Sequence, residues 1–244
     1  LNNRDHRKIT VIDGKVAYTG GYNLANEYFN ITHPYGIWKD TGIRMEGDAV
    51  KSMTVAFLEM WNAAGNVKSK ELVPEKYVIN HAYQAQQRGY VQPYADSPLD
   101  GEQVGEEVYI SMANKAEKYC WFITPYLIIT DEMTHALTLA AKRGVDVRII
   151  TPGIPDKKMP YMVAETYWGE LLRHGVKIYR YTPGFLHSKS VLADRELALV
   201  GSTNMDYRTF QLQYETAVLL YQSPAVEELL EVDGIGQATL DGLR

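Results

Sequence analysis

One spaced pattern of residues occurs twice in this chain, and it constrains the fold more than any other feature of the sequence. The pattern is H-x-K-x4-D-x6-G-x2-N. Its members are His6, Lys8, Asp13, Gly20 and Asn23 in the first copy, and His187, Lys189, Asp194, Gly201 and Asn204 in the second. Because repeated units of sequence usually fold as repeated units of structure, we expect two similar lobes that face each other across a pseudo-two-fold axis, each giving half of one site.

The first copy of the pattern is predicted to form a β-hairpin. Apolar-rich arms at residues 8–12 and 15–20 flank Asp13-Gly14, which is a strong signal for a type I′ turn. Asp13 follows His6 at an odd offset, so it is expected in the turn, bonding its own backbone, rather than beside His6. Asp194 has the same place in the second copy.

The other motif residues are expected to converge. Side chains two apart on a strand face the same way, so each motif His projects together with its motif Lys. Each motif Asn follows the second strand of its hairpin, which returns beside the first strand and brings the Asn near the His. Two acids, Asp40 and Glu215, each precede a strand after one of the motifs, and a carboxylate there would set the tautomer of an imidazole.

Two imidazoles, two ammonium groups and two amides in one place suit the chemistry of a phosphodiester. One His attacks phosphorus as a nucleophile, and the other protonates the leaving oxygen and then deprotonates the incoming alcohol or water. The lysines neutralise the non-bridging oxygens, and the amides donate hydrogen bonds to them. No His, Cys, Asp or Glu residues have the spacing of metal ligands, so neither a metal nor another cofactor is expected.

The order of the predicted elements indicates the fold class. Strands are predicted at residues 41–47, 118–124, 145–151, 176–182 and 214–221, and helices are predicted to be capped by Asp48 and Asp131 or opened by Pro160 and Pro224. Strands that alternate with helices and then form hairpins favour an α/β fold, in which each lobe has a mixed sheet flanked by helices. Turn-forming residues at 92–101 place the lobe boundary near residue 95, giving a first lobe of 1–95 and a second lobe of 96–244.

Composition narrows the classes of function. The 244 residues are 45% hydrophobic and carry a formal charge of −5 without a long run of one sign, which argues against broad nucleic-acid binding. The single cysteine, Cys120, excludes a disulfide within the chain and is expected in the core. No stretch approaches the ~20 apolar residues that a helix needs to span a bilayer.

With these motifs the chain resembles the phospholipase D superfamily, whose members carry HxKx4D sequences. "HRKITVIDGKVAYTGGYN" and "HSKSVLADRELALVGSTNMDYRTFQLQYE" are similar to the bacterial cardiolipin synthase branch, as are "TPYL", "AAKRGVDVRIITPG" and "HGVKIYRYTPGFLHSKS". The resemblance implies a phospholipase D-like fold and a metal-independent, two-step transfer through a phosphohistidine. It also implies that a phosphatidyl group moves from one phosphatidylglycerol to another at a membrane surface, releasing glycerol.

The resemblance also implies roles for individual residues. His6 matches the nucleophile and His187 the general acid and base, whereas Gly21 departs from the second motif, which has a serine at that place. The phosphate-binding positions are matched by Lys8, Lys189, Asn23, Ser202 and Asn204. The orienting acids are matched by Asp40 and Glu215, and the third catalytic positions of the motifs by Asp13 and Asp194.

The start of the chain departs from the family pattern. Five residues precede His6, whereas roughly 90 residues precede the second motif within its lobe, so we expect the first lobe to be incomplete at its N-terminus. The expected location is the bacterial inner membrane, reached through hydrophobic anchors outside this chain. Two other readings stay open: a phospholipase D-type phosphodiesterase or nuclease, and a fragment of a synthase without activity. The acceptor alcohol and the oligomeric state do not follow from the sequence.

Overall fold

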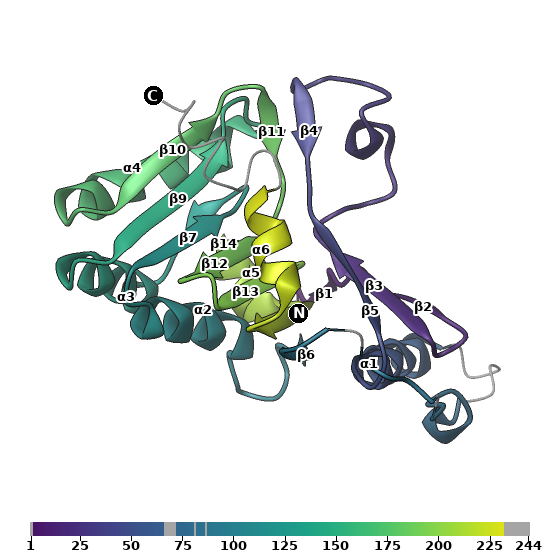
Figure 1. Cartoon of the computed structure of the whole chain (residues 1–244). Coiled ribbons are helices and arrows are strands. Elements are labelled where there is room, and N and C mark those ends of the chain that lie inside the picture. Colours follow the sequence, from purple (N-terminus) through teal and green to yellow (C-terminus); the bar gives the residue numbers. More distant parts are fainter. Residues whose placement is uncertain (1, 66–71, 81, 86, 232–244) are drawn as a thin grey trace.

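The computed structural model describes residues 2–65, 72–80, 82–85 and 87–231, which form an α/β fold around one large mixed sheet (Figure 1). Its central strands pair in parallel toward one edge and antiparallel toward the other side, where the outermost short strand again pairs in parallel. The strands in spatial order are β1 (Arg4–Asp5), β15 (Gln213–Tyr221), β13 (Leu197–Gly201), β12 (Ser190–Ala193), β7 (Tyr119–Ile123), β9 (Asp146–Pro152) and β10 (Lys177–Tyr181). A further strand, β6 (Tyr90–Asp96), pairs with β15.

The two faces of the large sheet bury separate hydrophobic cores. Three helices cover one face: α2 (Val104–Lys115), α3 (Asp131–Lys142) and α4 (Lys158–Arg173). Because side chains alternate along a strand, Cys120 and Phe122 of β7 pack under these helices, while Trp121 and Ile123 face the other way. Cys120 is fully buried, as predicted, and burial raises the pKa of its thiol.

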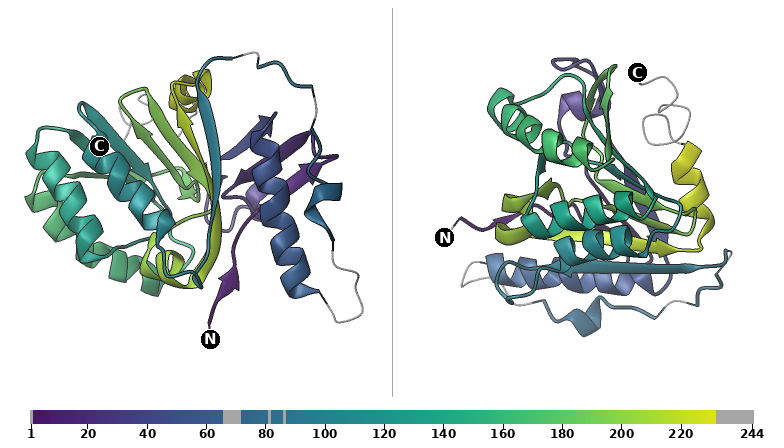
Figure 2. Two further views of the ribbon diagram at one scale, coloured as in Figure 1. Left: turned by 90° about the horizontal axis from the view of Figure 1, so that it is seen from below. Right: turned by 90° about the vertical axis from the view of Figure 1, so that its left-hand side faces the viewer.

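A smaller sheet packs against the second face of the large sheet. It contains β2 (Thr10–Ile12), β3 (Val16–Gly20) and β5 (Gly42–Glu46), and α1 (Ala49–Ala64) lies against it beside β6 (Figure 2). Every pair in this sheet is antiparallel, whereas a mixed sheet was expected in both lobes. The cause is the β2–β3 hairpin, in which Asp13 and Gly14 have φ angles of 53° and 62° that match a type I′ turn.

Four short strands connect segments that are far apart in the chain. One parallel pair joins β4 (Ile37–Lys39) to β11 (Gly184–Leu186), and another joins β8 (Leu127–Ile128) to β14 (Met205–Asp206). The remaining elements are the 3-10 helices η1 (Asn26–Phe29) and η2 (Pro74–Lys76), and the helices α5 (Tyr207–Leu212) and α6 (Pro224–Glu231). These short pairs matter for function, because β11 leads directly into the motif residue His187, β4 leads into Asp40, and β14 directly follows the motif residue Asn204.

The strands predicted at residues 41–47, 118–124, 145–151, 176–182 and 214–221 are confirmed to within one residue at each end. The first hairpin arm, predicted from residue 8, begins at Thr10, and two helix caps differ. Thr130 rather than Asp131 caps α3, since its hydroxyl accepts a hydrogen bond from the amide of Met133. Asp48 does precede α1, yet its carboxylate forms an ion pair with Lys51 instead of capping the helix. The proposed lobe boundary near residue 95 falls inside β6, which pairs with β15 along its whole length.

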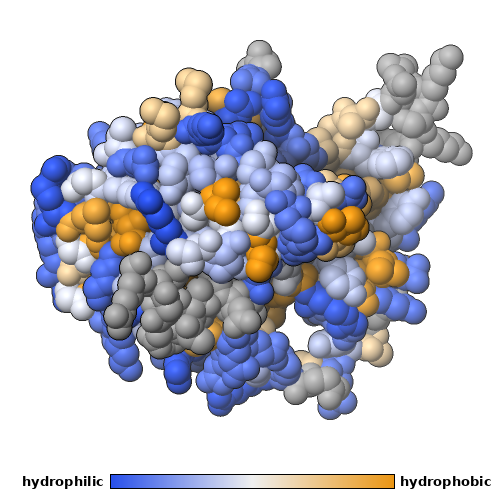
Figure 3. Space-filling view, turned by 90° about the horizontal axis from the view of Figure 1, so that it is seen from above, coloured by the Kyte–Doolittle hydropathy of each residue, from blue (hydrophilic) through white to orange (hydrophobic). Residues whose placement is uncertain are grey.

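The face of the molecule drawn in Figure 3 is mostly hydrophilic. Seen from above in Figure 3, the hydrophobic residues lie in small patches separated by hydrophilic ones. Among the helices of the described residues, none is both long enough and apolar enough to cross a membrane.

Candidate active site

The short strand β1 sets the position of His6. Its two residues pair in parallel with the start of β15, and the amide of His6 donates to the carbonyl of Tyr214 at 3.0 Å. The imidazole therefore lies beside the next residue of β15, Glu215. Nδ1 of His6 is 2.9 Å from Oε1 and 3.1 Å from Oε2 of Glu215, which is fully buried.

The same arrangement surrounds His187. Strand β11 pairs in parallel with β4, and the amide of His187 donates to the carbonyl of Lys39 at 2.7 Å. The residue after Lys39 is Asp40, and its Oδ2 lies 2.6 Å from Nδ1 of His187.

Each imidazole is thus oriented by the carboxylate that follows the other motif. The sequence indicated Asp40 and Glu215 as orienting acids but left their partners open, and the structure pairs His6 with Glu215 and His187 with Asp40. A carboxylate that accepts Nδ1–H holds the ring in the tautomer whose lone pair is on Nε2. In both histidines Nε2 is therefore the nitrogen left to react.

The two carboxylates are supported in different ways. The Ser202 hydroxyl is fully buried and donates to Glu215, and it accepts from the amide of Thr216 at 3.0 Å. The proton of this hydroxyl is donated to the carboxylate, and the phosphate-binding role of Ser202 stays a prediction. At the matching place in the first motif, a Cβ on Gly21 would lie 2.3 Å from Oδ1 of Asp40. Because Gly21 has no side chain, the Asp40 carboxylate fits beside it.

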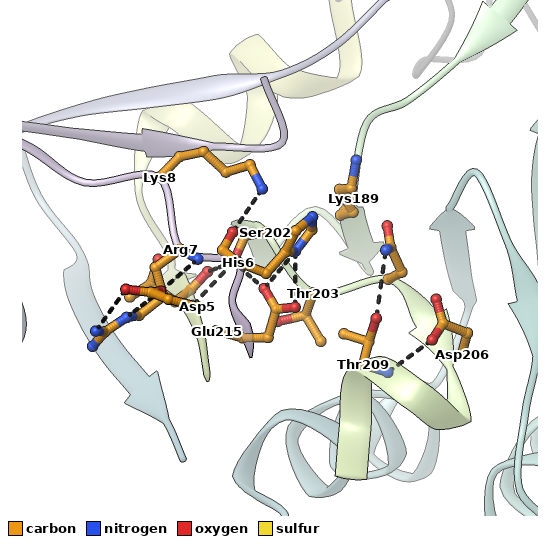
Figure 4. Close-up of polar contacts among 12 residues, drawn as sticks. Asp5, His6, Arg7, Lys8, Lys189, Ser202, Thr203, Asp206, Thr209 and Glu215 are labelled. Atoms are coloured by element: carbon orange, nitrogen blue, oxygen red, sulfur yellow. Dashed lines mark hydrogen bonds and ion pairs between the residues drawn. The ribbon is translucent and has the colours of Figure 1, made fainter. Parts of the chain in front are cut away.

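The two motif lysines lie close to the histidines. Nζ of Lys8 donates to the carbonyl of His6 at 2.6 Å, while Nζ of Lys189 donates to the carbonyl of His187 and lies 2.9 Å from Nε2 of that ring. In Figure 4, Lys8 lies on one side of His6 and Lys189 on the other, with Ser202 and Glu215 near the His6 ring. Each ammonium group therefore lies beside the histidine of its own motif, although neither lysine is among the residues that line the pocket described below.

Burial controls the ionisation of these groups. It lowers the pKa of Lys8 to about 8 and the pKa of Lys189 to about 7, because a charged ammonium loses hydration there. Burial and then the neighbouring Lys189 ammonium lower the pKa of His187 to about 3, so that His187 is neutral at rest. Burial also raises the pKa of Glu215, although the hydrogen bonds from His6 and Ser202 oppose this.

Both histidines line one pocket of about 890 Å³. The His6 side chain is 26% exposed and the His187 side chain 8%, so His6 is the more accessible of the two. The rings of Tyr28, Trp38 and Phe185 pack around His187 with centroid distances of 5.1, 5.3 and 5.8 Å, which accounts for its burial.

Asn23 and Asn204 line the same pocket. Nδ2 of Asn23 donates to Oη of Tyr28 at 2.8 Å. Asn204 is 7% exposed, its Nδ2 lies 3.4 Å from Oγ1 of Thr209, and its Oδ1 has no hydrogen-bond partner among the described residues. The amide NH2 group carries two protons, so Nδ2 of Asn204 can donate to Thr209 and keep a second proton for an anion.

Asp13 and Asp194 lie in the two hairpin turns, and neither lines the pocket. The Asp194 carboxylate accepts hydrogen bonds from the backbone amides of Glu117, Lys118 and Tyr119 at 2.7, 2.9 and 2.8 Å. These bonds tie the β12–β13 turn to the start of β7. The geometry therefore gives Asp194 a structural part rather than the catalytic role implied by its motif position.

Sequence reasoning assigned no role to several polar residues that line the pocket, among them Tyr28, Tyr126 and Asp156. Oη of Tyr126 donates to Oδ2 of Asp156 at 2.8 Å. Tyr126 lies in "TPYL" and Asp156 follows "RIITPG", two of the segments that carried the family resemblance, but neither residue was assigned a role there. Within the described part of the chain, no group of three or more His, Cys, Asp or Glu side chains is placed to hold a metal ion.

Comparisons with known proteins agree with this geometry. Residues 109–232 match the family model described as "Cardiolipin synthase, PLD-like domain". The chain is 36% identical to a cardiolipin synthase of Halalkalibacterium halodurans over 94% of its own length and 45% of the relative's. It is 50% identical to an uncharacterized protein of Streptococcus mutans over 93% of its length and 49% of the relative's. The chain thus spans about half the length of the relatives it matches.

A solved structure supports the fold. The phosphatidylserine synthase of Haemophilus influenzae superimposes with a TM-score of 0.66 at 15% identity, covering 92% of this chain and 59% of that one. At this identity the likeness concerns the fold alone. The family model covers half of the sequence and includes the second HxKx4D motif. The histidines of both motifs line one pocket. The chain therefore belongs to the phospholipase D superfamily, in its cardiolipin synthase branch.

Proposed function

We propose that this site transfers a phosphatidyl group from one phosphatidylglycerol to another, forming cardiolipin and releasing glycerol through a phosphohistidine. The observation that carries the proposal is the pair of imidazoles on one pocket, each bonded through Nδ1 to a carboxylate of the other half. This arrangement presents two reactive Nε2 atoms to one substrate, as a two-step phosphoryl transfer requires. The proposed lipid substrate would place the protein at the surface of the bacterial inner membrane.

In the first step His6 is the nucleophile, since it is the more exposed of the two histidines. Its Nε2 attacks phosphorus and forms the N–P bond, while the bond between phosphorus and the glycerol oxygen breaks. His187 gives a proton to that oxygen, and glycerol leaves. Glu215 stabilises the positive charge that develops on the His6 ring, because it accepts the Nδ1 proton.

In the second step the hydroxyl of another phosphatidylglycerol attacks the phosphohistidine. His187, now neutral, removes the hydroxyl proton as the O–P bond forms and the N–P bond breaks. Lys8 and Lys189 balance the charge of the non-bridging oxygens, and Asn204 can donate the second proton of its amide NH2 group to one of them. Water in place of the alcohol would give hydrolysis, so the geometry also serves a phospholipase D.

The free site keeps His187 neutral, so this ring must gain a proton before it can act as the general acid. A phosphodiester anion beside Lys8 and Lys189 replaces part of their lost hydration and favours their charged forms. Nζ of Lys189 lies 2.7 Å from Nδ1 and 2.9 Å from Nε2 of His187, so the Lys189 ammonium contacts the ring that must gain this proton.

The test is product analysis by mass spectrometry. The chain is incubated with phosphatidylglycerol vesicles and, separately, with single-stranded DNA. Diphosphatidylglycerol and free glycerol that disappear in His6→Ala and persist in His135→Ala, an exposed histidine of α3, support the proposal. Phosphatidic acid alone would assign a hydrolase, and released nucleotides would assign a nuclease. No product in any assay would overturn the enzymatic function of this chain.

A further inference from the structure

The pocket extends well beyond the two histidines. The end of the pocket at the start of α4 is lined by Tyr126, from the turn between β7 and β8, by Asp156 and Lys157, which precede α4, and by Pro160 in the first turn of that helix. A phosphate group held by the motif residues would leave this end for another part of the substrate. None of the four residues belongs to an HxKx4D motif.

This end of the pocket offers hydrogen-bond acceptors. The Tyr126 hydroxyl donates its only proton to Oδ2 of Asp156 at 2.8 Å, so its remaining capacity is to accept. Burial and the neighbouring Asp156 raise the pKa of Tyr126, which keeps that proton in place. The second carboxylate oxygen, Oδ1, is buried and has no hydrogen-bond partner among the described residues. Buried acceptors without donors are rare in folded proteins and call for a partner.

The charges at this end favour a neutral partner. The Asp156 carboxylate would repel a phosphate or another anion. A cationic head group would meet Lys157, whose Nζ lies 5.7 Å from the centre of the Tyr126 ring. Hydroxyl groups supply the missing donors without adding charge, and their oxygens can accept from the Lys157 ammonium.

We propose that Tyr126 and Asp156 form a polyol subsite, which binds the hydroxyl groups of the glycerol that leaves in the first step and of the glycerol that attacks in the second. This inference rests on the proposed function and deepens it, because it assigns the choice of a hydroxyl-rich alcohol to named residues outside the motifs. The carboxylate holds the Tyr126 hydroxyl in its accepting orientation, and this hydroxyl oxygen accepts a proton from a glycerol hydroxyl.

Binding of two small phosphodiesters tests the subsite without requiring turnover. Methyl glyceryl phosphate and methyl propyl phosphate share the phosphodiester and differ only in two hydroxyl groups. Their affinities for the full chain are measured by ligand-observed NMR titration. We expect the glyceryl ester to bind about 10–100-fold more tightly, since a site built to bond hydroxyls rejects an analogue that lacks them.

Two variants and one control make the result specific. Asp156→Asn and Tyr126→Phe should reduce the preference for the glyceryl ester to a few-fold or less and leave the affinity for the propyl ester unchanged. Glu132→Gln, which alters an exposed carboxylate of α3, should keep the full preference. Circular dichroism confirms folding of each variant.

The possible outcomes separate the two levels of the proposal. Equal affinity of the wild type for both esters, or an equal loss of both in the two variants, overturns the polyol subsite and leaves the phosphotransfer site standing. Failure of the wild type to bind either ester overturns the phosphodiester site itself, and the polyol subsite with it.

Discussion

Binding of a phosphodiester should draw protons into the site. Burial lowers the pKa of Lys189 to about 7 and the pKa of Lys8 to about 8, from an ordinary value of 10.5. An anion placed between the two ammonium groups favours their charged forms and moves both pKa values back upward. The complex therefore holds more protons than the free protein, and affinity should fall as the pH rises above about 7.

The size of the uptake follows from these values. At about pH 7.5 in the free site, Lys189 is about one-quarter charged and Lys8 about three-quarters charged. Full protonation in the complex then takes up about 0.8 proton at Lys189 and about 0.2 proton at Lys8, or about one proton in all. Near pH 6 both lysines are already charged, so the uptake should fall to about 0.1 proton.

Isothermal titration calorimetry measures this uptake directly. Methyl glyceryl phosphate is titrated in buffers of different ionisation enthalpy, and the slope of the observed enthalpy against that quantity gives the number of protons. Lys189→Met should reduce the uptake to about 0.2 proton at about pH 7.5, while Lys15→Met, at an exposed hairpin position, should not change it. A slope of zero in the wild type, or an unchanged slope in Lys189→Met, would refute the reasoning.

Three substitutions test other parts of the site. Gly21→Ser should lower the transfer rate by about 100-fold or more, because its Cβ would displace the Asp40 carboxylate that orients an imidazole; Gly169→Ala, which has open space in α4, should not change the rate. Asp194→Ala should lower the free energy of unfolding by about 2–4 kcal/mol through the loss of three hydrogen bonds to backbone amides; urea titration checks this, and a normal rate per folded molecule separates a structural role from a catalytic one. The Tyr28 hydroxyl accepts from Nδ2 of Asn23, so its own proton can be donated to the phosphate. Tyr28→Phe should therefore slow transfer by about 10–100-fold without changing stability, and an unchanged rate contradicts this role.

The local features of the fold were predictable because they depend on short stretches of sequence. The type I′ hairpin follows from Asp13-Gly14, whose two residues tolerate positive φ angles. The strands of the second lobe follow from their apolar runs and from the turns between them. The cap of α3 was placed one residue too late, at Asp131 instead of Thr130, because both residue types are good caps and only the hydrogen bond to Met133 distinguishes them.

The candidate site was only partly predictable. The duplicated motifs indicated His6 and His187 as partners, but no local pattern shows that the Ser202 hydroxyl donates its hydrogen bond to Glu215. Tyr126 and Asp156 were missed for the same reason, since they are 30 residues apart and meet only when two loops fold over one pocket.

The sequence by itself determined which side chains can carry the chemistry, because the chemistry depends on residue type and the pattern occurs twice. Only the tertiary structure decided how those side chains serve one another. The exchange of carboxylates between His6 and His187 arises where β1 pairs with β15 and β11 pairs with β4, and each pair joins opposite halves of the chain. Such pairing depends on the packing of whole sheets, which no stretch of sequence around either histidine contains.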